Sequence, residues 1–149
     1  MTRQTIRNVA FWTTTILGPA SFAIGGVLNL SQSEQVAVTM QHLGYPLYFA
    51  SILGFWKLAG AIAIVVPGLP RVKEWAYAGF FFNLTAAAAS RAAVGDSAVD
   101  VILPLVYLAL VLASWALRPA SRKLAATAHA PVHPDADLSS AYRLAVQTR

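Results

Sequence analysis

Lys57 is the residue whose position most strongly suggests chemistry. It lies within the apolar run Leu47–Val66, nine residues from the end of that run, which is about 13 Å along a helix. If the run crosses a membrane, an isolated lysine at its centre costs about 2.5–3.5 kcal/mol, and such residues usually face the bundle interior at functional sites. We therefore predict that Lys57 points inward and meets a partner group. The alternative is a shorter or more tilted helix from which Lys57 reaches the interface.

Two polar residues in later apolar runs are predicted to lie at the same depth as Lys57. Asn83 is eight residues from Trp75 and Tyr107 is ten residues from Leu117, which correspond to about 12 and 15 Å of helix. Their oxygens could accept hydrogen bonds from an ammonium group. The ligand-binding candidates are therefore Lys57, Asn83, Tyr107 and the deep tryptophan beside the lysine, Trp56. Asn83 could equally make an ordinary interhelical hydrogen bond.

Other kinds of site find little support in the residue types. The chain has no cysteine, which excludes disulfides and thiol chemistry. His42 stands alone, and Pro131 interrupts the helix that would bring His129 and His133 to one metal. We therefore expect no metal site. No catalytic triad or phosphate-binding loop is visible, and the basic residues form no nucleic-acid-binding helix or platform.

The composition requires a lipid environment for the elements that carry these residues. Hydrophobic residues make up 57% of the 149 residues and charged residues only 11%, against about 25% charged residues in soluble domains. Four apolar runs are each long enough to cross a bilayer. The sequence therefore predicts an all-α fold, an antiparallel bundle of four transmembrane helices over residues 9–30, 47–66, 75–93 and 99–117.

The distribution of basic residues predicts the orientation of this bundle. Cytoplasmic loops carry an excess of Lys and Arg, and one side of the predicted bundle holds seven of them. Both termini and the loop between the second and third helices should therefore be cytoplasmic, in a bacterial plasma membrane. The basic residues on that side are Arg3, Arg7, Arg71, Lys73, Arg118, Arg122 and Lys123, whereas the opposite side holds only Arg91.

The segments outside the four runs are predicted as follows. The long outer loop over residues 31–46 could form a short interfacial helix or strand. Arg91 and Asp100 should pair at facing helix ends, and Glu74 could pair with Lys73 or Arg71.

Residues 1–119 should form the membrane domain, and residues 120–149 a largely disordered cytoplasmic tail. The beginning of the chain resembles a signal peptide, but its apolar run continues to Leu30, which favours an uncleaved helix.

Several motifs in order resemble the DoxX-like family of small four-helix membrane proteins. They are a Tyr-Pro start at Tyr45, a Lys-Leu-x-Gly at Lys57 and a Lys-Glu-Trp-Ala-Tyr-x-Gly at Lys73. The similarity extends over about residues 9–119. The family pattern falls on Gly44, Tyr45, Pro46, Lys57, Gly60, Glu74, Trp75 and Gly79. The resemblance implies links to quinone-linked oxidation, to redox stress or to chaperoning of membrane receptors.

Three functions follow from these residues and from the resemblance. The first is an accessory bundle, not an enzyme on its own, that binds a hydrophobic ligand or a partner membrane protein, with Lys57 contacting an anionic or carbonyl group. The second is the membrane subunit of a quinone-linked oxidoreductase, with quinone as a possible cofactor and with a partner subunit to supply electrons. The third is a small transporter, which would require several copies to assemble into a homo-oligomer.

Overall fold

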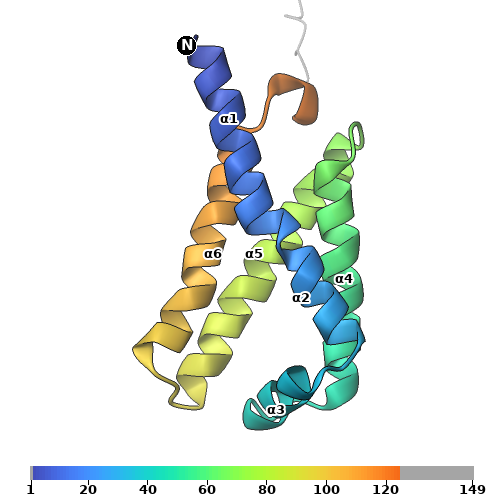
Figure 1. Cartoon of the computed structure of the whole chain (residues 1–149), viewed down its shortest axis with the longest axis vertical. Helices are drawn as coiled ribbons and strands as arrows, with labels where there is room; N and C mark the ends of the chain where they lie inside the picture. Colours follow the sequence, from blue (N-terminus) through green and yellow to red (C-terminus); the bar gives the residue numbers. More distant parts are fainter. Residues whose placement is uncertain (1, 125–149) are drawn as a thin grey trace, which may run out of the picture.

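A computed structural model describes residues 2–124 of the chain, and all regular elements in that part are helical (Figure 1). The all-α prediction is therefore confirmed for these residues, whereas residues 125–149 of the predicted tail lie outside them. The α-helices are α1 (Arg3–Thr15), α2 (Phe22–Leu30), α3 (Glu34–His42), α4 (Leu47–Val65), α5 (Pro70–Ala93) and α6 (Ala98–Leu117). A π-helical turn, Ile16–Ala20, joins α1 to α2, and a 3₁₀ turn, Ala120–Arg122, follows α6.

Three segments are long and apolar enough to cross a membrane: Arg3–Leu30, Leu47–Val65 and Ala98–Leu117. The chain is therefore a multi-pass membrane protein by length and composition. Helix α5 is 24 residues long but more polar, because its first turns contain Arg71, Lys73 and Glu74. A fourth transmembrane span at α5 therefore stays a prediction.

The first apolar run is divided by a bend at Pro19. Proline has no backbone N–H to donate, and the helix widens into the π-helical turn at this point. The Ser21 hydroxyl donates to the carbonyls of Leu17 and Gly18, at 2.9 and 2.7 Å. As a result α1 packs along α6, whereas α2 packs along α4. The helix also begins at Arg3 and not at Val9 as predicted.

The connections at the two ends of the bundle are short. The loop over residues 31–46, predicted to lie on the outer side, forms helix α3, which selects the helical alternative of the prediction. Gly44 follows it with a φ of +75°, and Pro46 precedes the first residue of α4. At the opposite end, Pro70 occupies the first turn of α5, where its missing N–H costs nothing. Helix α5 therefore begins five residues before the predicted Trp75.

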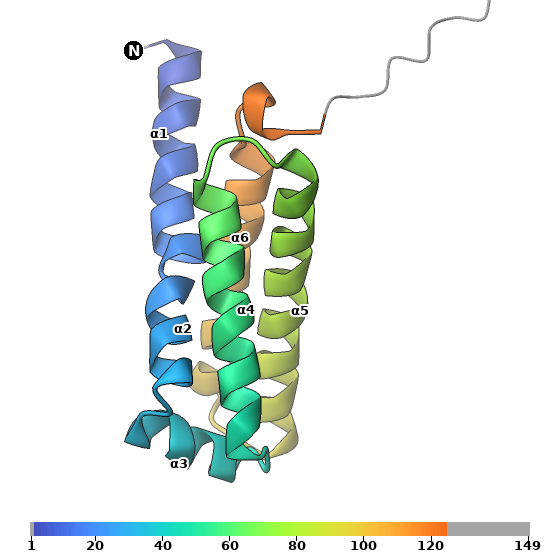
Figure 2. The ribbon, with the colours of Figure 1, turned by 90° about the vertical axis from the view of Figure 1, so that its right-hand side faces the viewer.

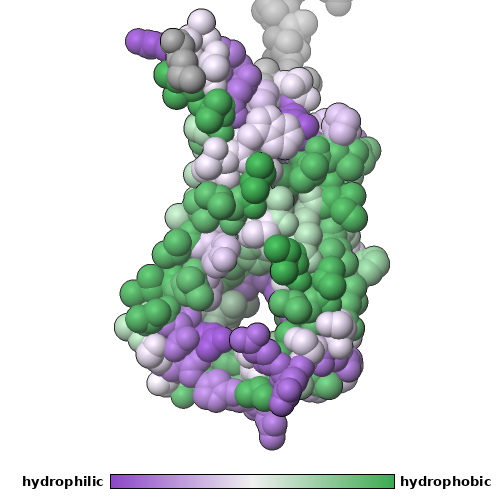
Figure 3. Space-filling view, viewed as in Figure 1, coloured by the Kyte–Doolittle hydropathy of each residue, from purple (hydrophilic) through white to green (hydrophobic). Residues whose placement is uncertain are grey.

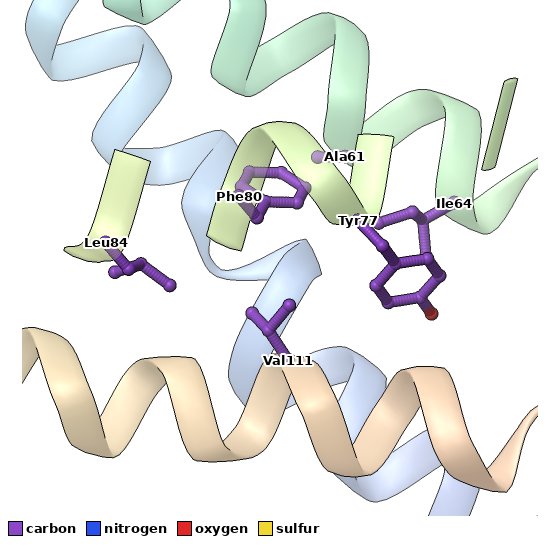
Figure 4. Packing of buried hydrophobic residues seen from close by; sticks show 6 residues of the cluster. All are labelled: Ala61, Ile64, Tyr77, Phe80, Leu84 and Val111. Carbon is purple, nitrogen blue, oxygen red and sulfur yellow. The ribbon is translucent and has the colours of Figure 1, made fainter. Parts of the chain in front are cut away.

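The helices enclose a small core. Figures 1 and 2 show the start of α1 and the turns between the helices at two opposite ends of the bundle. The N-terminus, the α4–α5 turn and the 3₁₀ turn lie at the N-terminal end, whereas α3 and the α5–α6 turn lie at the α3 end. The core cluster joins α4, α5 and α6 (Figure 4). It consists of Ala61, Ile64, Tyr77, Phe80, Leu84 and Val111.

Buried polar groups close the N-terminal end of the bundle. Lys73 is 1% exposed and donates to the carbonyls of Ala63 and Ile64 in α4 and of Val66, which follows α4. It therefore caps the C-terminus of α4, where the helix dipole favours a cation. Arg122 donates to the carbonyls of Ile64 and Val65, at 3.0 and 3.1 Å. Residues near 122 are therefore held against the bundle.

Glu74 pairs with a residue that the sequence analysis did not consider. Its carboxylate accepts from the Arg118 guanidinium at 2.7 Å and from the Trp115 indole N–H at 2.9 Å. Lys73, one of its predicted partners, instead donates to the end of α4. This ion pair joins the N-terminal part of α5 to Arg118, the residue that follows α6.

Candidate functional site

A cavity of about 440 Å³ lies among α2, α4, α5 and α6, in the half of the bundle closest to α3. We call it the central cavity. Most of its wall is apolar and includes Phe22, Met40, Leu53, Leu84 and Leu103. The bend at Pro19 creates this space, because it directs α2 toward α4 and away from the N-terminal half of α6. Figure 3 shows the molecule hollowed in this half, above a hydrophilic rim at the α3 end.

The polar groups deepest in the cavity surround Lys57. Asn29, which is buried, accepts a hydrogen bond from Lys57 Nζ at 3.3 Å when its amide is oriented to donate to the Gly25 carbonyl at 3.1 Å. The Lys57 ammonium also lies 5.8 Å from the centre of the Phe22 ring, within the range of a cation–π contact. An ammonium group has three donors, so this arrangement leaves N–H groups that a molecule in the cavity could use.

Three of the four predicted binding residues line this cavity. Lys57, Asn83 and Tyr107 all border it, although the predicted contact of Asn83 and Tyr107 with the Lys57 ammonium is not among the hydrogen bonds of residues 2–124. The Tyr107 ring instead packs edge-on against Phe22, with 5.8 Å between ring centres. The fourth residue, Trp56, is 67% exposed and borders a different cavity.

Asn29 was not predicted as the partner of Lys57. A first transmembrane helix that reaches the membrane surface at Leu30 would place Asn29 far from the depth of Lys57. In the structure α2 ends beside the middle of α4, because Gly54 packs against Gly26 and Leu30. Two glycines, Gly26 on α2 and Gly54 on α4, were the available signal of this close approach.

A charged cluster lies at the mouth of the central cavity. Arg91 contacts Asp96 at 2.9 Å and Asp100 at 3.8 Å, so the predicted Arg91–Asp100 pair forms but is the longer of the two. The Nε2 of His42 lies 2.6 Å from an oxygen of Asp96. This hydrogen bond, with a smaller contribution from Arg91, holds the pKa of Asp96 below its usual range.

These contacts attach α3 to the rest of the bundle. His42, the last residue of α3, reaches the α5–α6 turn through Asp96. Just beyond α3, the Tyr45 hydroxyl lies 2.8 Å from the Ser90 hydroxyl of α5. Because α3 residues such as Met40 also line the central cavity, α3 covers its mouth.

A second cavity of about 400 Å³ lies between α4 and α5; Figure 2 shows these two helices side by side. We call it the α4–α5 groove. Its lining includes Trp56, Gly60, Ala63, Trp75, Gly79 and Phe80. Leu53, Lys57 and Asn83 line both this groove and the central cavity.

The remaining motif positions serve turns, packing or the groove. Gly44 and Pro46 form the turn before α4, and Tyr45 contacts Ser90. Gly60 lies under the Phe80 ring, since a Cβ added there would be 3.1 Å from it. Glu74 pairs with Arg118, Trp75 is 80% exposed, and a Cβ added at Gly79 would meet nothing within 4 Å.

Comparison with known proteins identifies one family. The model of the DoxX-like family matches residues 13–114 of the chain, which include every residue of the central cavity and of the α4–α5 groove. No curated protein and no solved structure matches the chain significantly. The match confirms the resemblance found in the motifs.

Proposed function

The chain belongs to the DoxX-like family of membrane proteins, and from this premise we propose that it is a four-helix membrane bundle that binds a hydrophobic small molecule in its central cavity. The binding is non-catalytic, and Lys57 contacts an anionic or carbonyl group of the ligand. One observation carries the proposal: a largely apolar cavity of about 440 Å³ has a lysine and two asparagines at its deep end.

The fourth span of this proposal is α5. It runs between α4 and α6 and packs against both, so in a bilayer it shares their depth. Beyond its first turn the exposed side chains of α5 are apolar, with Phe82 67% exposed. The basic residues of the N-terminal end support a cytoplasmic location for that end under the positive-inside rule, and we assign the protein to a bacterial plasma membrane.

The cavity fits the usual features of a small-molecule site. Such sites have volumes of about 300–1,000 Å³, mostly apolar walls and a few polar groups that fix orientation. The apolar wall here comes from α2, α3, α4, α5 and α6, and the polar groups are Asn29, Lys57, Asn83 and Tyr107. Inside a membrane a lysine is retained at a cost, and a ligand acceptor would offset that cost.

Lys57 supports a ligand function better than a purely structural one. Lys73, which has a structural role, is enclosed by three carbonyls at the C-terminal end of α4. Lys57 is only half-buried and borders two cavities. Its single amide partner is 3.3 Å away, which is longer than a typical charged hydrogen bond.

Copurification tests the proposal. Wild type, Lys57→Met and Lys57→Arg would be purified in mild detergent, and bound small molecules would be extracted and identified by mass spectrometry. We expect a lipophilic molecule with a carbonyl or anionic group in wild type, its loss in Lys57→Met and its partial retention in Lys57→Arg, which keeps the charge. A bound quinone would favour the redox alternative. Equal recovery of the same molecules from wild type and Lys57→Met would refute the role of Lys57.

A further inference from the structure

The central cavity and the α4–α5 groove are arranged end to end. The central cavity extends from Lys57 toward α3, and its lining reaches Arg91 and Asp100. The groove extends from Lys57 toward the N-terminal end, and its lining reaches Ala63 on α4 and Val72 on α5. They meet at Leu53, Lys57 and Asn83, which border both. A molecule held at Lys57 can therefore extend into either space.

The two spaces differ in chemistry. The central cavity has polar groups at both its deep end and its mouth. The groove is lined by apolar side chains and glycines, and Lys57 and Asn83 are its only strongly polar residues. The groove therefore suits a hydrocarbon, and its polar end coincides with the polar end of the central cavity.

The groove is open on the side that faces lipid. Trp56 and Trp75 stand on its border and are 67% and 80% exposed. Gly79 leaves space in it, because a Cβ added there would meet nothing within 4 Å. The Phe80 ring, packed against Gly60, is buried and forms the floor. An acyl-like chain can enter such a groove from the bilayer without passing through water.

We propose that the α4–α5 groove holds the hydrocarbon tail of the ligand, so that the ligand is a single-chain amphiphile whose hydrogen-bond-accepting head lies at Lys57. This inference rests on the proposed function, because it assigns the head to the central cavity. The tail leaves between α4 and α5 and ends in the membrane half near the N-terminal end.

We assign the occupant of the groove as a ligand tail because the groove is continuous with the central cavity and because of the charge of Lys57. The groove joins the central cavity at Lys57, so a tail and its head occupy connected space. A second copy of the chain is the competing occupant. A symmetric pair uses the same patch on both copies, so pairing through this groove would bring two Lys57 side chains to one apolar interface, where like charges repel.

Photolabelling in vesicles tests this assignment. The probes are hexadecanoic acid and a long-chain methyl ketone, each with a mid-chain diazirine, added to purified protein in phosphatidylcholine vesicles. We expect cross-links on the groove residues of α4 and α5, and we expect excess unlabelled probe to abolish them. Gly79→Leu and, separately, Ala59→Leu place a side chain in the groove and should abolish this saturable labelling. Gly25→Leu is the matched control, because a Cβ there also meets nothing within 4 Å but lies outside the groove.

The outcomes separate this inference from the proposed function. If both groove variants fold, as judged by thermal unfolding, and are labelled like wild type, the tail does not lie in the groove. Labelling that excess probe does not reduce reports bulk lipid contact and also overturns the assignment. Cross-links between two copies through the groove would assign it to a dimer. If groove labelling stays saturable in Lys57→Met, the groove binds a tail but the head assignment fails, and with it the proposed function.

Discussion

Replacing Gly54 by alanine should force α2 and α4 apart. A Cβ at position 54 would lie 2.7 Å from the Gly26 carbonyl oxygen and 2.9 Å from the Leu30 nitrogen. Both are backbone atoms, so no change of rotamer can relieve the contact. To reach an ordinary separation of 3.4 Å, the two helices must move by about 0.7 Å in a closely packed bundle.

The expected loss of stability follows from two opposing effects. Overpacking of this kind costs about 1–3 kcal/mol, whereas replacing glycine by alanine within a helix gains up to about 1 kcal/mol. We therefore expect Gly54→Ala to lower the free energy of unfolding by about 1–2 kcal/mol. Gly79→Ala is the matched control, since its added Cβ meets nothing within 4 Å; it should be neutral or slightly stabilising.

Thermal unfolding of the purified protein in mild detergent, followed by circular dichroism, measures this difference. We expect a lower midpoint for Gly54→Ala than for wild type, and an equal or higher midpoint for Gly79→Ala. If the two alanine variants are equally stable, α2 does not approach α4 at Gly54, and the placement of Asn29 beside Lys57 would also be wrong.

Three further predictions concern the rest of the bundle. Ser114→Ala removes the hydrogen bonds of the Ser114 hydroxyl to Thr15 and Tyr77, of 2.6 and 2.8 Å, and should cost about 1–2 kcal/mol in the same thermal assay; an unchanged midpoint would contradict this. The pKa of Asp96 is held low in the folded protein, chiefly by the hydrogen bond from His42. The Asp96 carboxylate therefore contributes its full stabilisation above its unfolded pKa of about 4. This stabilisation is lost as the pH falls through the lower pKa of the folded state. Thermal midpoints measured from pH 7 to pH 3 should therefore fall less for Asp96→Asn than for wild type, and parallel curves would refute the link. Reporters fused after residue 40 and after residue 125 should report the outside and the cytoplasm respectively, and an external C-terminal reporter would reverse the orientation.

The helical bundle was predictable because length and hydropathy act locally. The long, mostly apolar runs predicted the helices at α4 and α6. The start of α5 was predicted five residues late, because its first turns are polar. They are held by contacts with other helices, such as the Lys73 bonds to the end of α4.

The candidate site was predictable only in part. The depth of Lys57 follows from the residue count along one helix, and the structure brings Asn83 and Tyr107 to the same cavity. The Asn29 partner could not be predicted from depth, since it depends on the bend at Pro19 and on the close approach of Gly54 to α2. A residue count treats each apolar run as one straight helix, whereas the run that contains α2 is bent at Pro19.

The central claim is that the cavity at Lys57 holds a lipophilic ligand, and a structure of the protein purified with its native lipids into nanodiscs tests it most directly. We predict non-protein density in the central cavity, within hydrogen-bond distance of Lys57 Nζ, with the same density missing from Lys57→Met. A cavity filled by the protein's own side chains or by water alone, with Lys57 turned toward the membrane surface, would contradict the account.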